Sequence, residues 1–363
     1  MSWDVAVAGG GLAGAAAAMR LAEAGRRVIL FEREAGAHDK VCGEFLSAEA
    51  AQELVALGLP PERLEAASIG AVRVAAGRTL ATAALPFAAH GLSRRRLDEA
   101  LLAAASARGV AVRRGVSVRA IAPDGDGVAV ATRGEAARAD VALLATGKHD
   151  LAGWRRGRAT DTIGLKLHLG LDEAQSRQVA GHVELALFRG GYAGLQLVEG
   201  GVANLCLVVT RARFAACGRD WRRLVAEVPH LALRLAGATV RHGRPLAVAG
   251  MPYGWLAEDP TSMPVYRLGD QAAVIPSFTG DGMAMALRSA RAAASAILAG
   301  RPPAEFQQGL VRSFRGPVRL AGLLAGIAAT QPAQQVLAAA ARVAPALLAH
   351  LAMATRIGAP VRR

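Results

Sequence analysis

The sequence has 363 residues, and its 43 lysine and arginine residues against 29 aspartate and glutamate residues give a formal net charge of +14. Nearly all of this excess is arginine. With only 4% aromatic residues and no interleaving of basic and aromatic positions, the sequence argues against a nucleic-acid-binding protein. We attribute the charge to a coding composition rich in arginine, alanine and glycine. Cys42, Cys206 and Cys217 form neither a disulfide framework nor a metal-ligand spacing.

The hydrophobic fraction of 53% is enough for a large core, in one large domain or two interleaved ones. Asp4 interrupts the first apolar run, so no secretory signal peptide is expected. Together with the unpaired cysteines this predicts a cytoplasmic protein with no metal centre.

The first structural signal is the glycine-rich segment 9–14, which directly follows an apolar run. We predict a buried strand over residues 4–8, a helix over 12–24 and a second strand over 27–31. The second strand ends at Glu32, about where an acidic residue accepts a ribose hydroxyl in dinucleotide-binding folds. This order of elements favours a dinucleotide site over an ordinary glycine-rich turn.

Each small residue of this segment has an expected role. Gly9 permits a tight turn, Gly11 lets the backbone approach a pyrophosphate, and Gly14 lets the helix pack closely on the strand. The free backbone N–H groups where the helix begins, at Leu12 and Ala13, would favour an anion.

The middle of the chain reads as a hairpin, a helix and more strands. Segment 67–86 has the pattern of a hairpin, and Ser93 is a suitable N-cap for a helix that extends to about residue 108. Strand-like segments follow at 110–114, 117–121, 128–132 and 140–144.

From about residue 160 to 252, alternating apolar residues predict an antiparallel sheet. Its strands are expected at 163–169, 182–188, 192–198 and 202–209, and a helix near 220–227 should cover it. A strand at 265–268 and a helix at 283–299 follow. The side chains that we take as substrate-facing candidates on or near this sheet are His168, Tyr192, Gln196, Tyr253 and Trp255.

The tail, residues 315–363, reads as alanine- and leucine-rich helices broken at Pro317, Pro332, Pro345 and Pro360. Its uncharged stretch 320–341 contains three glutamines and a proline and is a poor membrane span. Two interpretations stay open: packing against the core or a second subunit, or peripheral contact with a membrane surface. In the second, the polar side of the helices would carry Arg312, Arg315, Arg319, Arg342 and Arg356.

A second glycine signature lies about 260 residues after the first. It comprises Gly269-Asp270, then Pro276, then Gly280-Asp281-Gly282, and it precedes the predicted helix at 283–299. Two such signatures in this order indicate one FAD molecule lying extended through one fold. The positive end of the helix would stabilise negative charge on a reduced flavin.

At this point the sequence resembles the flavoproteins of the p-hydroxybenzoate hydroxylase fold, particularly their geranylgeranyl-reductase-like branch. The resemblance covers residues 1 to about 300 and rests on five segments in order: 9–18 with Glu32, 40–44, 93–101, 140–147 and 269–282. It implies an α/β fold in which a Rossmann-like FAD-binding domain (1–66, 90–159 and 263–300) is interleaved with an antiparallel-sheet substrate domain (67–89 and 160–262). A C-terminal helical segment (301–363) follows.

The resemblance also implies which residues meet the cofactor. Arg94 would reach the FAD phosphates, Asp270 would bind the ribityl chain, and residues 276–279 would line the front of the flavin ring. We expect Cys42 to be a packing residue beside the flavin. The full set of expected cofactor-binding residues is Gly9, Gly11, Leu12, Ala13, Gly14, Glu32, Arg33, Cys42, Gly43, Arg94, Thr146, Gly147, Gly269, Asp270, Pro276, Gly280, Gly282 and Met283. Those nearest the chemistry would be Cys42, Gly43, Pro276, Gly280 and Gly282.

Two departures shape the expected function. Where the family usually has Asp-Gly, this chain has Thr146-Gly147, which supplies no carboxylate, so reduction by NAD(P)H competes with reduction by a separate reductase. The Trp-x-Trp-x-Ile-Pro element of flavin-dependent halogenases is absent, which argues against that activity.

We therefore predict an FAD-dependent oxidoreductase, a monooxygenase of secondary metabolism that hydroxylates a small, largely apolar molecule through a flavin hydroperoxide. The alternative is reduction of C=C bonds in a prenyl or polyketide chain. A third, weaker hypothesis is a membrane-surface protein with a vestigial flavin fold.

Overall fold

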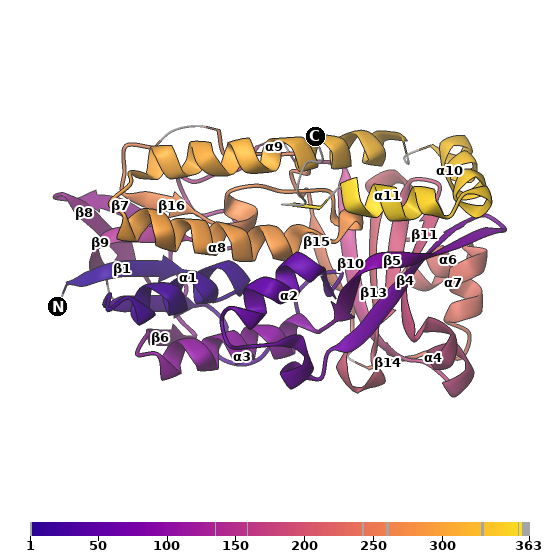
Figure 1. Cartoon of the computed structure of the whole chain (residues 1–363), viewed down its shortest axis with the longest axis horizontal. Helices are drawn as coiled ribbons and strands as arrows, with labels where there is room; N and C mark the ends of the chain where they lie inside the picture. The colour runs from indigo at the N-terminus through magenta and orange to yellow at the C-terminus, as the bar shows by residue number, and fades with distance from the viewer. Residues whose placement is uncertain are drawn as a thin grey trace.

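Two β-sheets lie side by side along the long axis of the molecule (Figure 1). The computed structural model describes residues 2–134, 136–157, 159–241, 243–258, 261–327, 330–354 and 356–357. The architecture is mixed α/β with C-terminal helices, which confirms the expected fold class.

The first sheet has the strand order β6-β2-β1-β9-β8-β7, with β16 beside β9. Strands β6, β2, β1, β9 and β16 are parallel, whereas β8 and β7 add an antiparallel hairpin. The central parallel strands β1, β2 and β9 contribute mostly apolar residues to hydrophobic clusters on the two faces of the sheet. The bounds are β1 (Trp3–Ala8), β2 (Val28–Glu32), β6 (Ala111–Arg114), β7 (Ala120–Asp124), β8 (Gly127–Ala131), β9 (Ala136–Leu144) and β16 (Val265–Arg267).

Helices pack together over one face of this sheet and form the largest hydrophobic core. Helix α1 contacts both α3 and α8, while α2 and α9 pack on α8. Ser47 caps α2 and Ser93 caps α3, each side chain accepting a backbone N–H three residues on, as expected for Ser93. The bounds are α1 (Leu12–Glu23), α2 (Ala48–Val55), α3 (Arg94–Ala107), α8 (Gly282–Leu298) and α9 (Pro303–Ile327).

The second sheet has the order β14-β10-β13-β12-β11-β4-β5-β3, with β15 beside β10. The strands are β3 (Phe45–Leu46), β4 (Ala67–Ala76), β5 (Thr79–Gly91), β10 (Thr162–Gly170), β11 (Gly181–Phe188), β12 (Gly191–Leu197), β13 (Ala203–Thr210), β14 (Thr239–Val240) and β15 (Leu246–Ala249). Its outer face packs on short helices, α4 (Glu173–Val179), α5 (Arg211–Ala216), α6 (Trp221–Ala226) and α7 (Pro229–Arg234), of which only α6 was expected.

One pairing in this sheet differs from the antiparallel prediction: β4 and β11 run parallel. These strands come from segments about 110 residues apart, so no hairpin fixes their direction. Glu184 of β11 faces Arg73 of β4 in the register and accepts its hydrogen bond at 2.6 Å. Arg234 and His230 of α7 contact the same carboxylate. Burial alone would raise the pKa of Glu184, but these three partners lower it to about 2.

Most other predicted elements are confirmed within a few residues. The strand expected at 117–121 instead begins at Ala120, because the turn at residues 124–127 sets the β7–β8 register. Pro317 lies inside α9 rather than breaking it. Phe314, Val318 and Ala321 are all buried around it, so core packing carries the helix through the missing hydrogen bond.

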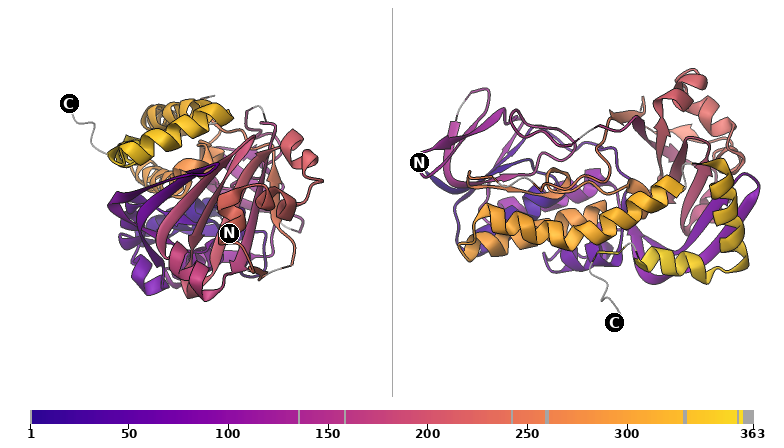
Figure 2. Two further views of the ribbon diagram at one scale, coloured as in Figure 1. Left: turned by 90° about the vertical axis from the view of Figure 1, so that its right-hand side faces the viewer. Right: turned by 90° about the horizontal axis from the view of Figure 1, so that it is seen from above.

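The tail continues as α10 (Gln331–Val343) and α11 (Ala346–Ala354), which pack on β5 of the second sheet (Figures 1 and 2). Arg312, Arg315, Arg319 and Arg342 are exposed as expected. Arg356 is not: its side chain is buried, which corrects the prediction that it lies on the polar side. Pro360 lies outside the described residues. No single described helix is long and apolar enough to span a membrane, although α10 and α11, bent by 116°, pass that test as a pair.

Gly14 offers a test of the packing between α1 and β1. A Cβ atom at Gly14 would lie 1.9 Å from the carbonyl oxygen of Gly9. Gly14→Ala should therefore lower the free energy of unfolding by at least the roughly 1–3 kcal/mol typical of overpacking. Gly316→Ala in α9 is the matched control, since its Cβ would meet open space and should stabilise by about 1 kcal/mol or less. Chemical denaturation measures both; a Gly14→Ala protein of wild-type stability would contradict the close approach.

Candidate functional site

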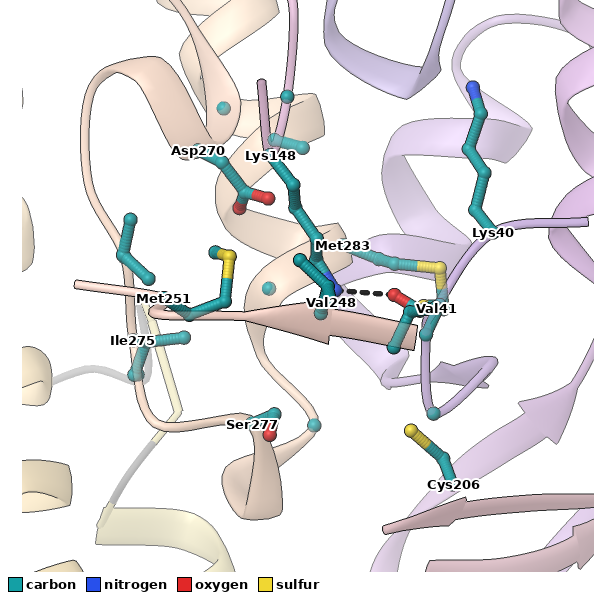
Figure 3. Close-up of a pocket in the computed structure, with 18 of the residues that line it drawn as sticks. Lys40, Val41, Lys148, Cys206, Val248, Met251, Asp270, Ile275, Ser277 and Met283 are labelled. Atoms are coloured by element: carbon teal, nitrogen blue, oxygen red, sulfur yellow. Dashed lines mark hydrogen bonds between the residues drawn. The ribbon is translucent and has the colours of Figure 1, made fainter. Parts of the chain in front are cut away.

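A single cavity of about 1530 Å³ extends from the carboxyl ends of β1 and β2 to the inner face of the second sheet. The first glycine segment, the 38–45 loop, the second glycine segment and the tail helices all contribute to its wall. Figure 3 shows part of it, where the side chain of Lys148 lies between Asp270 and Met283 and donates to the carbonyl oxygen of Val41. Every expected cofactor residue lines this cavity except Gly14, which is buried beneath the turn.

The nucleotide end is built by close backbone contacts. Gly9 has φ +111°, and a Cβ there would lie 2.3 Å from the carbonyl oxygen of Ala145. Gly11 is the N-cap of α1, and no side chain caps the helix. The carboxylate of Glu32 accepts the backbone N–H of Gly10 at 2.9 Å, which fixes the acid beside the turn. The uncapped helix start is thus left open toward the cavity, as an anion site requires.

Two cations face this helix start. A Cβ at Gly11 would lie 3.4 Å from Nη2 of Arg94 and 3.5 Å from Nζ of Lys40. Both cations pair with Asp98, at 2.9 Å and 2.7 Å. Burial alone would raise the pKa of Asp98, but Arg94 and Lys40 hold it below its usual value. Arg94, Lys40 and Asp98 together carry one net positive charge, which fits a pyrophosphate. Lys40 was missed by the sequence analysis, although it lies in the same 40–44 segment as Cys42.

The second glycine segment forms the opposite wall. The 3₁₀ turns at Gly269–Gln271 and Ser277–Thr279 carry Asp270 and Ser277 at the cavity surface, and α8 begins at Gly282. Gly280 has φ +74°, and a Cβ there would lie 2.6 Å from the ring of Phe45. No side chain caps α8, so its N-terminal N–H groups at Gly282 and Met283 are open at the cavity wall.

Asp281, between Gly280 and Gly282 of this segment, is fully buried. Its Oδ1 lies 3.1 Å from Nη1 of Arg356, which follows α11. Burial raises the pKa of Asp281 to about 7, with Arg356 opposing and Glu49 adding to the rise. Nothing in the sequence pattern connects these residues, which are 75 positions apart.

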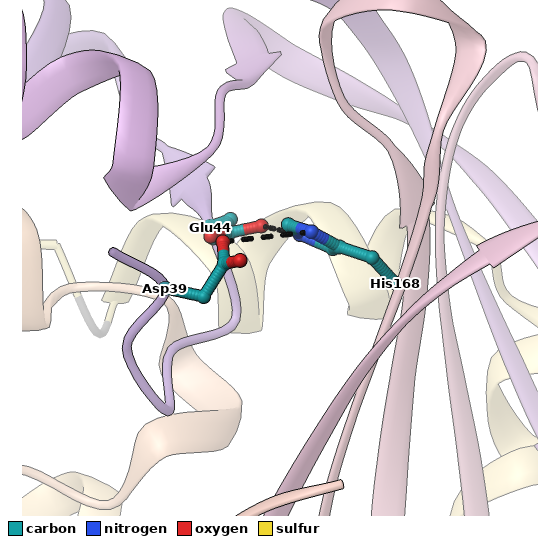
Figure 4. A group of neighbouring side chains, drawn as sticks. All are labelled: Asp39, Glu44 and His168. Atoms are coloured by element: carbon teal, nitrogen blue, oxygen red, sulfur yellow. Dashed lines mark hydrogen bonds and ion pairs between the residues drawn. The ribbon is translucent and has the colours of Figure 1, made fainter. Parts of the chain in front are cut away.

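The 39–44 loop is held between the two sheets by a buried charge cluster (Figure 4). The carboxylate of Glu44 contacts Nζ of Lys166 at 2.5 Å, Nε2 of His168 at 2.7 Å and the backbone N–H of Arg94 at 2.8 Å. Asp39 lies 3.4 Å from the same ammonium group. Oxygen and nitrogen atoms of Asp39, Glu44 and His168 approach one another as metal ligands do. Because Lys166 already supplies a cation there, we assign the cluster to fixing the loop.

His168 therefore lies beneath this loop and does not line the cavity, which corrects its assignment as a substrate residue. The prediction that Trp255 faces the substrate is also wrong. Its side chain packs against Gly157 and Arg267 and does not line the cavity. Tyr192, Gln196 and Tyr253 do line the cavity. On β12, the two-residue period turns Tyr192 and Gln196 inward and Leu195 outward into the core beneath the short helices.

The remaining expected residues have modest roles in the geometry. Cys42 Sγ accepts the backbone N–H of Glu44 at 3.4 Å, and burial raises the pKa of Cys206 to about 12, so it stays a thiol. Thr146 Oγ1 donates to the carbonyl of His149 at 2.7 Å, and Gln271 holds the same turn. A hydroxyl engaged with the main chain thus occupies the place of the family's acid.

Comparison with known proteins identifies the kind of domain and fold that the chain has. Residues 2–145 match the family model of the FAD binding domain, whereas comparison with curated proteins returns no match. The structure is similar to the flavin-dependent brominase Bmp2 (16% identity, 98% of this chain and 94% of that chain, TM-score 0.80). It is also similar to the myxobacterial chondrochloren halogenase CndH (20%, 99% and 92%, 0.79) and to halogenase PltM in complex with phloroglucinol and FAD (16%, 98% and 87%, 0.76).

The fold and the site thus define a flavoprotein of the p-hydroxybenzoate hydroxylase-type fold. Residues 2–145 carry its FAD binding domain. Identities of 16–20% to these halogenases establish the shared fold and not a shared reaction.

Arg94 provides a test of the phosphate end. Arg94→Ala should weaken FAD binding by about tenfold or more, the scale of one lost charge-assisted hydrogen bond. The exposed neighbour Arg95 is the matched control, and Arg95→Ala should leave the Kd for FAD unchanged. Quenching of flavin fluorescence gives both values, and melting of the FAD-free proteins separates loss of binding from loss of folding around Asp98. Equal affinities for the two variants would remove Arg94 from the site.

The raised pKa of Asp281 has a consequence for stability. Between the ordinary carboxyl pKa and about 7, the folded protein binds more protons than the unfolded chain, so this group makes the protein less stable as pH rises. Between about pH 5 and about pH 8, the Tm of Asp281→Asn should therefore fall less than the Tm of the wild type. The exposed Asp126→Asn is the control. Identical pH profiles for all three proteins would show that Asp281 is ionised when folded.

Proposed function

We propose that the protein is an FAD-dependent monooxygenase acting on a largely apolar organic substrate. The observation that carries this proposal is the continuity of the cavity: one space joins the phosphate-binding end to an aliphatic chamber on the second sheet, past the N-terminus of α8. When bound, FAD supplies the redox chemistry. In the net reaction one atom of O₂ enters the substrate, the other leaves as water, and a reductant supplies two electrons.

The chain's own residues would provide the surroundings for this reaction. The N-terminus of α8 offers backbone N–H groups and a positive dipole end at Gly282 and Met283, where negative charge would be favoured. The aliphatic side chains of β4, β11 and the tail would exclude water from the substrate chamber.

Three hydroxyl groups would orient a polar atom of the substrate. The hydroxyls of Tyr192 and Tyr253 both contact Oγ of Ser277, the second at 3.3 Å. Two contacts use two of the three hydroxyl protons, which leaves one for an oxygen of the substrate. Burial raises the pKa of Tyr253 to about 12 and that of Tyr192 well above its usual value, so both would act as neutral donors.

The electron donor forms part of the proposal. The 146–149 turn offers a hydroxyl that already donates to the main chain rather than a carboxylate. We propose reduction either by NAD(P)H or by a separate reductase. The alternative function, reduction of a C=C bond in a prenyl or polyketide chain, is favoured by the extended aliphatic walls and would use the same cofactor residues.

Oxygen uptake separates these functions. The FAD-loaded protein is mixed anaerobically with NADH, NADPH or dithionite, and flavin absorbance is followed. Labelled O₂ is then admitted with 4-hexylphenol or a 4-alkenylphenol, and the masses of the products are measured by mass spectrometry. Incorporation of one labelled oxygen atom supports the monooxygenase. Addition of two hydrogen atoms without oxygen uptake would replace it by the reductase. Bleaching by dithionite alone would assign reduction to a partner protein.

A further inference from the structure

We propose that α11 is the wall that sets the length of substrate the chamber accepts, and that Arg356 is the positioning residue that seats this wall on the second glycine segment. The inference deepens the proposed function and names an elongated aliphatic molecule as the substrate class. It assigns a role to a tail that lies outside the FAD binding domain match.

The chamber lies between two aliphatic surfaces. On the sheet, β4, β5 and β11 present inward-facing residues at a two-residue spacing, including Val72, Val74, Leu85, Val183, Leu185 and Leu187. Opposite them, Leu347, Leu348, Leu351 and Ala352 of α11 line the same space. Their spacing of three and four places them on one face of the helix. Met353, which does not line the cavity, is 39% exposed.

The tail is anchored by buried polar contacts as well as by apolar packing. Ala338, Ala341 and Leu348 are buried in a cluster with the sheet strands. Gln334 is 2% exposed, and its Nε2 donates to the carbonyl of Phe188 at the end of β11 at 2.9 Å. Because these contacts hold α10 rigidly against the sheet, α11 has a defined place as the far wall of the chamber.

Arg356 joins this wall to the second glycine segment. Its side chain is 6% exposed, and Nη2 donates to the carbonyl of Thr279 at 2.6 Å while Nη1 lies 3.1 Å from the buried Asp281. The guanidinium also lies 5.0 Å from the ring centroid of Phe87. Nε donates to Ala352 at the end of α11 at 2.9 Å. A buried guanidinium is costly without such partners, so displacing α11 would take the charge of Arg356 away from Thr279 and Asp281.

This connection makes the chamber wall and the glycine segment move together. The Thr279–Gly282 backbone ends at the open N-terminus of α8, which faces the cavity. A substrate too long for the chamber would have to push α11 outward, and that displacement would pull on Thr279 and Asp281. Length selection and the geometry at the α8 N-terminus are therefore coupled through one side chain.

The first test uses the FAD-loaded full chain and a probe series of straight-chain 4-alkylphenols, from ethyl to dodecyl, with Kd measured by calorimetry. Each buried methylene should tighten binding about fourfold until the chain reaches α11, after which affinity should stop improving. Leu351→Trp should move this limit to a shorter chain and weaken the longest probes at least tenfold, leaving ethylphenol unchanged. Met353→Trp on the outer face of the same helix is the control. If Leu351→Trp weakens all probes equally, or none, the assignment of the wall is wrong.

The second test addresses Arg356 without turnover. In Arg356→Ala, amide hydrogen exchange over residues 346–354 should speed up at least tenfold, exchange in α3 should be unchanged, and the chain-length limit should disappear. Arg356→Lys keeps the charge, so its exchange rate should lie between those of the wild type and Arg356→Ala. Arg342 is an exposed arginine of the same tail, and Arg342→Ala should match the wild type. Unchanged protection of α11 in Arg356→Ala would overturn the positioning role. Because binding and exchange require no oxygen chemistry, a protein that shows the length limit but consumes no O₂ would refute the proposed function and leave this inference standing.

Discussion

The buried carboxylate of Glu44 is the contact on which the arrangement of the two sheets depends. It accepts the backbone N–H of Arg94 where α3 begins, and it contacts Lys166 and His168 of β10. Its own carbonyl accepts from Leu92 and Gln196. Glu44 is fully buried and has φ +57°, a conformation that a side chain adopts only when its surroundings impose it. Removing one member of this cluster would leave uncompensated buried charge, which is far more costly than any exposed ion pair.

This contact explains how one cavity can have both a part beside the cofactor residues and an aliphatic part for an apolar molecule. The inner face of the second sheet is polar where the 39–44 loop covers it, with Lys166, His168 and Asn204 bound to the loop. It is aliphatic farther along, on β4 and β11, where the tail helices cover it. The polar part places the loop beside the cofactor residues, and the side-chain nitrogen atoms of Lys166, His168 and Asn204 contact the loop in doing so. The aliphatic part is then free to receive an apolar molecule in a site with little competing water.

The tail shows why burial changes the meaning of a charged residue. In the sequence, Arg356 looks like the other arginines of an amphipathic segment, and those at 312, 315, 319 and 342 are indeed exposed. The fold instead brings Arg356 to Asp281, whose carboxyl is the fully buried acid of the second glycine segment. The local hydrogen bond from Arg356 to Ala352 gives no sign of this pair. A contact between residues 75 positions apart does not affect the local helix or strand propensity and leaves no periodic pattern in the sequence. Only the packed structure therefore shows it.

The sequence by itself determined the elements whose physical cause is local. Glycines at 9 and 14 are required by close backbone approach, Ser93 caps its helix, and alternating apolar residues define the strands of the second sheet. Tertiary structure decided what depends on distant segments. It set the parallel pairing of β4 with β11, the course of α9 through Pro317, and the burial of His168 beneath a loop. It also turned Trp255 away from the cavity and joined Arg356 to Asp281. These outcomes follow from side chains meeting across the fold, where packing and charge neutralisation override the preferences of any one segment.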